Sequence, residues 1–211
     1  MIPSRILNRF LGPGLDVGSV QFFARDLNGA LRRARPSTLT VRAASVDEID
    51  RLLDCCHPAR DPATLKERFG RGDQCFVAED AGGRLMHTGW VTTSRAHIPE
   101  LDLDVIMRAA EAYLYDAWAP PDRRGNGAFG LVLDEIFARL QAAGFSRAYS
   151  YVRGDNHYGL TSARRRLQPV ARLWYVNLFG RSVVLGRRGA GLPELRRSAG
   201  RGLVQAADTL P

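Results

Sequence analysis

The feature that most constrains the fold is a glycine-rich segment between two different hydrophobic patterns. Residues 117–140 read AWAPPDRRGNGAFGLVLDEIFARL. The preceding residues 112–118, AYLYDAW, are typical of a β-strand. After the glycines the apolar positions recur with helical period, and Gly144 is placed to end that helix. The sequence therefore predicts a strand, a glycine turn and a long helix in direct succession.

A helix that begins at such a turn is suited to binding an anion. About four backbone N–H groups have no partner at a helix N-terminus, where the helix dipole is positive. Glycines let a bulky anion approach these groups, so we expect the turn to hold phosphate. The chain lacks G-x-x-x-x-G-K-[ST]. Residues 125–130 match G-x-G-x-x-G by letter, but no parallel βαβ series precedes them, which argues against a dinucleotide-binding fold.

The remaining patterns predict a protein of the α/β class, α+β type. A strand is expected near residues 39–44, and Ser45 with Glu48 matches the capping box that starts a helix. Asp61 followed by Pro62 predicts the start of a second helix. Two further strands, separated by Ala81-Gly82-Gly83, form a hairpin. We therefore expect a mixed, mainly antiparallel sheet flanked by helices, with an N-terminal helical arm.

Three regions are predicted along the chain. Residues 1–37 form a basic amphipathic arm, whose helix is indicated by the spacing of Val20, Phe23, Leu27 and Leu31. Residues 38–186 form the main domain, and residues 187–211, rich in arginine and glycine, form a flexible tail. The arm could dock on its own domain or a partner subunit, or contact a membrane surface or an acyl-carrier protein. A homodimer is a further open alternative.

Composition limits the partners and the location. The 211 residues carry a formal charge of +8, which favours anionic partners such as nucleic acid, phosphorylated cofactors, acidic carrier proteins or anionic membranes. No zinc-finger, basic-zipper or RNA-binding strand motif is present, so we expect no specific nucleic-acid binding. The three cysteines and four histidines lack metal-ligand spacing, so no metal is expected. A cytoplasmic location is expected because no membrane-spanning run or signal-peptide h-region occurs.

From about Leu39 to Gly180 the order of these features resembles the GNAT superfamily of acyl-CoA-dependent N-acetyltransferases. PDRRGNG, residues 121–127, is similar to the family's P-x-x-R-G-x-G signature. The resemblance implies that backbone amides from Arg124 to Phe129 hold the pyrophosphate of acetyl-CoA, while the end of the strand pairs with the pantetheine arm. Phe129 departs from the small residue usual in the family. The residues implied in acyl-CoA binding are Trp118, Ala119, Arg124, Gly125, Asn126, Gly127, Ala128, Phe129 and Asn156.

The family's usual catalytic acid is missing from this sequence. The resemblance implies that Asn156 contacts the CoA arm, and many members have a tyrosine seven residues further on that protonates the leaving thiolate. Ala163 occupies that position here. Tyr175, Tyr158 or a water molecule could replace the acid, or the activity could have been lost. The sequence leaves the acid unassigned, with Tyr175 as a candidate catalytic residue.

Glu111 is the candidate general base. It stands thirteen residues before Arg124, the offset at which some family members carry a catalytic glutamate. Burial near the strand would move a carboxyl pKa upward, as a general base requires. Tyr113 and Tyr115 share the face of Glu111 and either shape an acceptor pocket or pack in the core. Asp116 is expected on the opposite face, in a buried ion pair.

The predicted function is transfer of an acetyl or other acyl group from CoA to a primary amine. The amine belongs to a small molecule or a protein; amino sugars, amino acids, polyamines, antibiotics and protein amines all remain open. Two alternatives use the same core: a long-chain N-acyltransferase that depends on an acyl-carrier protein, and a noncatalytic acyl-CoA-binding protein. A nucleic-acid-binding module is a third alternative, supported only by the charge and the arginine-rich tail.

Overall fold

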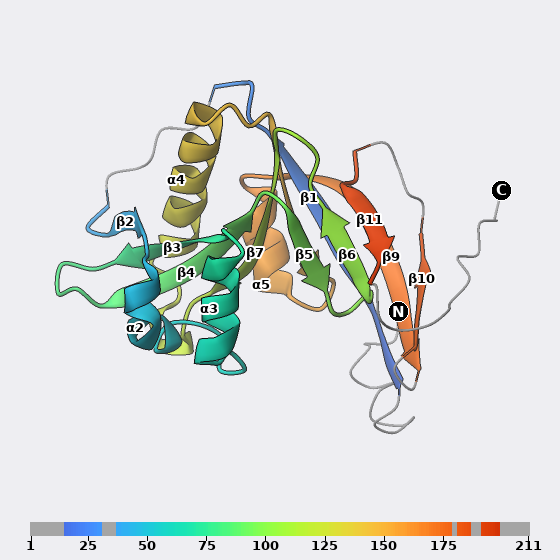
Figure 1. Cartoon of the computed structure of the whole chain (residues 1–211), viewed down its shortest axis with the longest axis horizontal. Helices are drawn as coiled ribbons and strands as arrows, with labels where there is room; N and C mark the ends of the chain where they lie inside the picture. Colours follow the sequence, from blue (N-terminus) through green and yellow to red (C-terminus); the bar gives the residue numbers. More distant parts are fainter. Residues whose placement is uncertain (1–14, 31–36, 179–180, 187–190, 199–211) are drawn as a thin grey trace. The chain divides into compact units, whose positions relative to one another are not determined.

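The computed structural model describes residues 15–30, 37–178, 181–186 and 191–198. The chain divides into two compact units, which Figure 1 shows in the colours of the sequence. Unit 2 comprises Asp26–Ser94 and Ala109–Ala148 and carries the glycine turn. Unit 1 comprises Met1–Arg25, Arg95–Arg108 and Tyr149–Pro211.

Unit 2 is built on an antiparallel sheet with strand order β7-β4-β3-β2. Its strands are β2 (Thr40–Ala43), β3 (Gln74–Glu79), β4 (Leu85–Thr92) and β7 (Glu111–Trp118). Its helices are η1 (Val46–Glu48), α2 (Ile49–Leu53), α3 (Pro62–Gly70), η2 (Pro121–Arg123) and α4 (Ala128–Ala142). The predicted hairpin is confirmed as β3 and β4, and the predicted strand, turn and long helix are β7, the glycine turn and α4.

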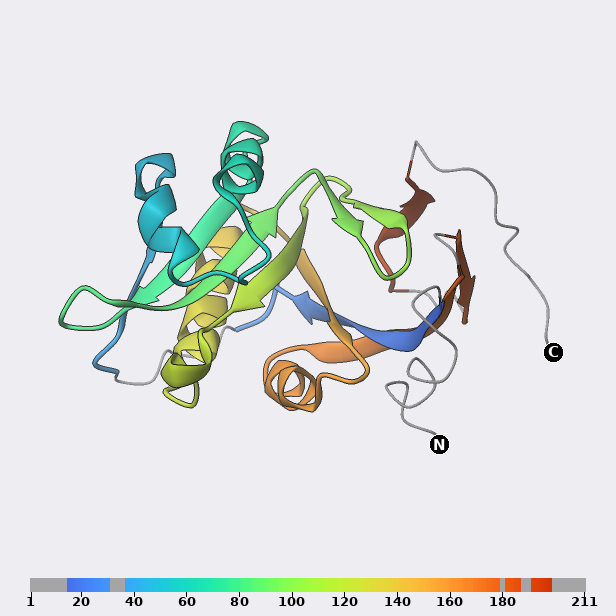
Figure 2. The same cartoon turned by 90° about the horizontal axis from the view of Figure 1, so that it is seen from below.

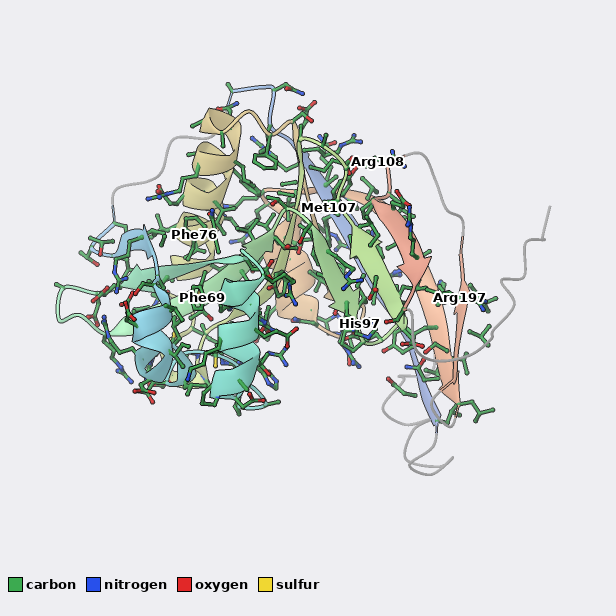
Figure 3. All side chains as sticks on the ribbon, in the orientation of Figure 1. Phe69, Phe76, His97, Met107, Arg108 and Arg197 are labelled. Carbon is green, nitrogen blue, oxygen red and sulfur yellow. The ribbon has the colours of Figure 1, made fainter. Side chains whose placement is uncertain are left out.

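Helices cover both faces of the unit 2 sheet because neighbouring strand residues point to opposite sides. Gly89 faces α4, and a Cβ at this position would lie 3.2 Å from Val132 Cγ1. The next residue, Trp90, faces α3, with its ring 4.9 Å from that of Phe69. Figure 2 shows α4 on one face of this sheet and α2 and α3 on the other. In Figure 3 the labelled Phe69 lies on α3, whereas the ring of Phe76 lies under the guanidinium of Arg139 from α4.

Two helix starts form as their sequences predict. The Glu48 side chain accepts a hydrogen bond from the Ser45 N–H at 3.0 Å, which completes the capping box of η1. Asp61 Oδ1 accepts from the Thr64 N–H at 2.8 Å, with Pro62 in the first turn of α3. These caps satisfy N–H groups that have no partner within the helix. Gly144, with φ +82°, follows the last turn of α4, so its predicted role at the end of that helix is also confirmed.

Unit 1 contains two antiparallel groups of strands, β10-β9-β1 and β11-β6-β5. The first group comprises β1 (Leu15–Asp26), β9 (Gln168–Leu178) and β10 (Arg181–Leu185). The second comprises β5 (Arg95–Ile98), β6 (Leu103–Ile106) and β11 (Glu194–Arg197); His97 and Arg197 are labelled in Figure 3. The chain enters unit 1 along β8 (Arg147–Arg153), which is followed by α5 (His157–Arg164).

The predicted N-terminal helix is wrong, because residues 15–26 form strand β1. Residues 19–24 are buried without interruption, and β1 pairs with β9 about 150 residues further along the chain. Val20 and Phe23 fit a helical spacing, but they belong to a run of six consecutive buried residues, which suits a strand covered on both faces. Leu31 lies outside the described residues.

Part of the predicted flexible tail is also a strand. Glu194–Arg197 forms β11 and pairs with β6 from Leu103 to Ile106. The tail's other residues at 187–190 and 199–211 lie outside the described part of the chain. The arginine-rich composition of this region therefore did not exclude regular structure.

The three cysteines are free thiols in the interior of unit 2. Burial raises the pKa of Cys55 to about 11, so its thiol stays protonated at neutral pH. Among the described residues, no group of three or more His, Cys, Asp and Glu side chains is arranged to hold a metal ion. Within the same ranges, no helix has the length and apolar character needed to cross a membrane.

Candidate functional site

The glycine turn links the end of β7 to the first residue of α4. Its backbone is extended at Arg124, whereas Gly125 and Gly127 have positive φ values of +83° and +82°. Only glycine adopts such angles without a steric penalty. A Cβ built on either glycine would meet nothing within 4 Å, so the space beside the turn is open.

The amides of this turn are available to a ligand. No acceptor in the described part of the chain takes a hydrogen bond from the N–H groups of Gly125, Asn126, Gly127 or Phe129. One amide is already used, because Asn126 Oδ1 accepts from the Ala128 N–H at 3.0 Å. Residues 124–127 are exposed. The turn therefore offers four backbone donors at the positive end of α4, which fits a phosphate group better than a neutral one.

Two neighbouring arginines act differently in the turn. Arg123 Nη1 donates to the Leu85 carbonyl oxygen at 2.7 Å, and this half-buried side chain ties the turn to the start of β4. Arg124 is exposed; its Nε donates to the Ala119 carbonyl oxygen, and its guanidinium lies 5.0 Å from the centroid of the Trp118 ring. Arg124 thus adds a positive charge beside the amides, while Arg123 supports the backbone.

Phe129 packs beneath the turn, against the sheet. Its half-buried ring meets the His87 imidazole edge-on, with centroids 5.6 Å apart and an interplanar angle of 76°. His87 is buried, and its Nε2 has no hydrogen-bond partner in the described chain. Burial lowers the pKa of His87 to about 4, so the imidazole is neutral at physiological pH. The bulky Phe129 side chain is accommodated by packing on His87 of β4.

Glu111 stands at the far end of β7 from the turn. It is the first residue of the strand and is half-buried. The seven steps to Trp118 span about 23 Å in an extended strand. A ligand that binds at the turn must therefore follow the whole strand to bring its reactive end to Glu111.

The two tyrosines that share the face of Glu111 belong to the core. The Tyr113 and Tyr115 rings are stacked with centroids 6.1 Å apart, and Tyr113 is buried. The Tyr115 hydroxyl donates to Asp73 at 2.6 Å. Of the two predicted roles, this arrangement favours core packing over an acceptor pocket.

Asp116 forms the predicted ion pair, but its predicted face is wrong. Its carboxylate accepts from Arg60 and Arg68, both at 2.6 Å, and Arg68 also lies over the Tyr115 ring. Asp116 therefore points to the same side of the sheet as Tyr115. The reason is a break in the strand's alternation, because Asp116 has a φ of +48°.

The remaining predicted site residues lie in unit 1. Asn156 is the N-cap of α5, where its Oδ1 accepts from the Gly159 N–H at 2.9 Å. Tyr175 is buried on β9 opposite Gly18, and burial raises its pKa to about 12. Ala163, at the position of the family's usual acid, is buried in α5, whereas Tyr158 is 90% exposed. The cofactor and catalytic roles of these residues stay predictions.

His57 is a further residue beside the turn that its sequence context did not indicate. It lies in the loop between α2 and α3, and its ring meets the Trp118 ring edge-on at 4.6 Å. Its Nδ1 accepts from the Ala59 N–H, so in the neutral ring the proton is on Nε2. No local motif marks this histidine, because its contact with β7 forms only when the loop folds over the strand.

Comparisons with known proteins identify the fold. No family model and no curated protein sequence matches the chain. A GCN5-related N-acetyltransferase from Sphaerobacter thermophilus superimposes with a TM-score of 0.58 at 15% identity, over 89% of this chain and 57% of that one. A protein from Novosphingobium aromaticivorans, described as a GNAT-family acetyltransferase, superimposes with a TM-score of 0.53 at 14% identity, over 79% and 67%.

A third similar structure is a tandem GNAT protein of the clavulanic acid biosynthesis pathway, with a TM-score of 0.53 at 14% identity, over 79% of this chain and 55% of that one. This chain thus spans about half to two thirds of the length of these three structures. The chain has the fold of the GNAT N-acetyltransferases, and the predicted mixed, mainly antiparallel sheet flanked by helices is confirmed.

Proposed function

We propose that this protein is an acyltransferase that moves an acetyl or other acyl group from CoA to a primary amine. The observation that carries the proposal is the exposed glycine turn at the start of α4, with backbone donors at Gly125, Asn126, Gly127 and Phe129. Open space beside Gly125 and Gly127 leaves room for a diphosphate. The GNAT fold supports the proposal, since this turn lies where the family's acyl-CoA signature is expected.

In this proposal the residues of unit 2 bind and orient the acyl donor. The turn amides and Arg124 neutralise the phosphates, and the backbone at Trp118 and Ala119 aligns the pantetheine arm with β7. The thioester is the reactive group that acetyl-CoA brings. A neutral amine attacks its carbonyl carbon, the new C–N bond forms as the C–S bond breaks, and CoA leaves as the thiolate.

Two protons must move in this reaction. The attacking amine loses one, and Glu111 is the proposed acceptor, directly or through a water molecule. The thiolate takes one up, and Tyr175 is the proposed donor because a hydroxyl with a pKa of about 12 is protonated at neutral pH. Each role is assigned by family position or by proton availability, and each is tested separately by substitution.

The experiment is an amine-panel assay with acetyl-CoA in which the released thiol is detected. The panel contains amino sugars, amino acids, polyamines, aminoglycosides and a lysine peptide, and octanoyl-CoA is run in parallel to test acyl length. Thiol release that depends on one amine class supports the proposal and identifies the acceptor. Failure to bind acetyl-CoA by calorimetry contradicts it.

A noncatalytic acyl-CoA-binding protein is the second candidate. The observation that favours it is Ala163, which is buried at the position of the family's usual acid and offers no hydroxyl. This candidate predicts acetyl-CoA binding without amine-dependent thiol release across the whole panel. The remaining alternative is a long-chain acyltransferase that takes its acyl group from an acyl-carrier protein. This alternative predicts turnover with an acyl-carrier thioester, at a rate that falls steeply as salt is added.

A further inference from the structure

Strand β7 carries one extra residue just before it reaches the glycine turn. Tyr115 pairs with Trp90 of β4, but Trp118 pairs with Thr88, two residues away. Asp116 and Ala117 therefore both lie opposite a single residue of β4, which defines a β-bulge. Asp116 has a φ of +48°, a left-handed conformation that is unfavourable for residues other than glycine.

Two arginines hold the carboxylate of this unusual residue. Arg60 donates to both oxygens, from Nε at 2.6 Å and from Nη2 at 3.0 Å. Arg68 donates from Nη1 at 2.6 Å. Arg60 comes from the loop before α3 and Arg68 from α3 itself, so the bulge is tied to two points of the neighbouring layer. Paired arginine–carboxylate bonds fix direction as well as distance.

Arg68, one of the two arginines that bind Asp116, is itself held in place. The Arg68 guanidinium lies 5.0 Å from the centroids of both the Trp90 and Tyr115 rings, and its side chain is only 9% exposed. Burial opposes ionisation of Asp116, but its bonds to Arg60 and Arg68 outweigh burial and lower the pKa of the carboxyl. The carboxylate therefore stays charged and bonded at neutral pH.

The bulge lies where it can control the turn. Asp116 is two residues before Trp118, whose ring supports Arg124, and three before Ala119, whose carbonyl oxygen accepts from Arg124. Without the extra residue the side chains after position 116 would exchange faces of the sheet. Bulges commonly redirect the end of a strand beside a functional site.

We propose that Asp116 is a positioning residue whose carboxylate, clamped by Arg60 and Arg68, holds the left-handed bulge that directs the end of β7 and the glycine turn toward the acyl donor. The proposal rests on the proposed function of the turn. The residue acts through the backbone and does not touch the donor. The backbone at position 116, rather than the charge, is what the site requires.

The test compares Asp116→Ala with Asp116→Gly, because both lose the ion pairs but only glycine adopts a positive φ freely. Glu67→Gln is the control, since Glu67 lies on the same helix as Arg68 and the change removes an exposed ion pair with Arg71, the C-cap residue of that helix. Acetyl-CoA affinity is measured by calorimetry under conditions in which urea titration shows each variant to be folded. Backbone ¹³C chemical shifts of residues 115–118 report the conformation of the bulge.

We expect Asp116→Ala to weaken acetyl-CoA binding about tenfold or more and to lose the left-handed shifts at residue 116. Asp116→Gly should keep both the shifts and an affinity within about threefold of the wild type. Glu67→Gln should change neither. A folded Asp116→Ala protein with wild-type affinity overturns the proposal. So does equal weakening in both Asp116 variants while the left-handed shifts persist, because the charge would then be the cause.

Failure of the proposed function gives a different result. If the wild type does not bind acetyl-CoA, the function fails, and the chemical shifts alone decide whether the clamp sets the backbone. The role of Asp116 in setting the backbone is supported if the left-handed chemical shifts are lost in Asp116→Ala and kept in Asp116→Gly. Chemical shifts that are unchanged in both variants overturn it. If Asp116→Ala does not fold, Arg60→Gln replaces it, because the Arg60 side chain is 32% exposed. Severalfold weaker binding supports the clamp, and unchanged binding and shifts overturn it.

Discussion

Gly127 and Gly144 stand at opposite ends of helix α4 with the same backbone φ of +82°. A Cβ at either position would meet nothing within 4 Å. A side chain therefore causes the same backbone strain at both, of about 1–2 kcal/mol. The two positions differ in the end of the helix dipole that they adjoin, and this difference makes them a matched pair.

Gly127→Glu is expected to weaken acetyl-CoA binding at least tenfold, because it adds bulk and negative charge where the phosphates should lie. Gly144→Glu causes the same backbone strain, so it should lower the free energy of unfolding by about 1–2 kcal/mol. It should leave acetyl-CoA binding unchanged. Calorimetry gives the affinity and urea titration gives the stability. Equal affinity in the two folded variants contradicts the assignment of the turn.

Glu111→Gln is expected to lower turnover by about 10²-fold or more if Glu111 accepts the amine proton. Acetyl-CoA affinity should stay within about twofold, because the residue stands at the other end of β7 from the turn. Turnover and affinity are measured across pH 6–9 with the amine identified by the panel. Full activity over this range removes Glu111 from the reaction and leaves a water molecule as the proton acceptor.

Tyr175→Phe tests the proton donor. Burial raises the pKa of Tyr175 to about 12, so its hydroxyl holds a proton throughout the neutral range. If it protonates the thiolate, the variant should lose about 10²-fold in turnover with little change in acetyl-CoA affinity. Tyr158→Phe is the matched variant, because Tyr158 is exposed and is the other tyrosine that could supply the proton. A loss confined to Tyr158→Phe reverses the assignment.

Local signals made much of this fold predictable. The capping box at Ser45 and Glu48, the cap at Asp61 and the hairpin between β3 and β4 depend on residues within a few positions of one another. The glycine turn is equally local, because φ angles above zero at Gly125 and Gly127 strongly favour that residue type.

Nonlocal contacts account for the errors. Strand β1 is stabilised by pairing with β9, a partner that no window around residues 15–26 contains, so a helical spacing was equally compatible with the sequence. The bulge at Asp116 depends on Arg60 and Arg68, which lie about 50 residues earlier. A strict two-residue alternation therefore placed Asp116 on the wrong face. The contact of His57 with Trp118 was missed for the same reason.

Gly18→Ala is expected to displace the side chain of Tyr175. The two residues pair across β1 and β9, and a Cβ on Gly18 would lie 2.5 Å from the Tyr175 hydroxyl oxygen and 2.7 Å from the ring carbon that bears it. The ring must move, at a cost of about 1–3 kcal/mol in the free energy of unfolding. Urea titration measures this cost, and Gly70→Ala is the control because a Cβ there meets nothing within 4 Å. Equal stability of the two variants argues against close packing of Tyr175 on Gly18.

His87 makes the stability of the protein depend on pH. Burial lowers its pKa from the usual 6.5 to about 4, so the unfolded chain binds a proton below pH 6.5 that the folded chain does not accept until about pH 4. The folded state should therefore lose up to about 3 kcal/mol as pH falls through this window. His87→Leu should abolish this part of the loss at little cost at pH 7, because Nε2 has no partner among the described residues. Urea titrations of the wild type and His87→Leu are run at pH 7, 5.5 and 4.5. The difference between the two proteins isolates the histidine from carboxylates that also titrate in this range. An identical pH dependence in the two proteins would show that His87 is not buried as a neutral imidazole.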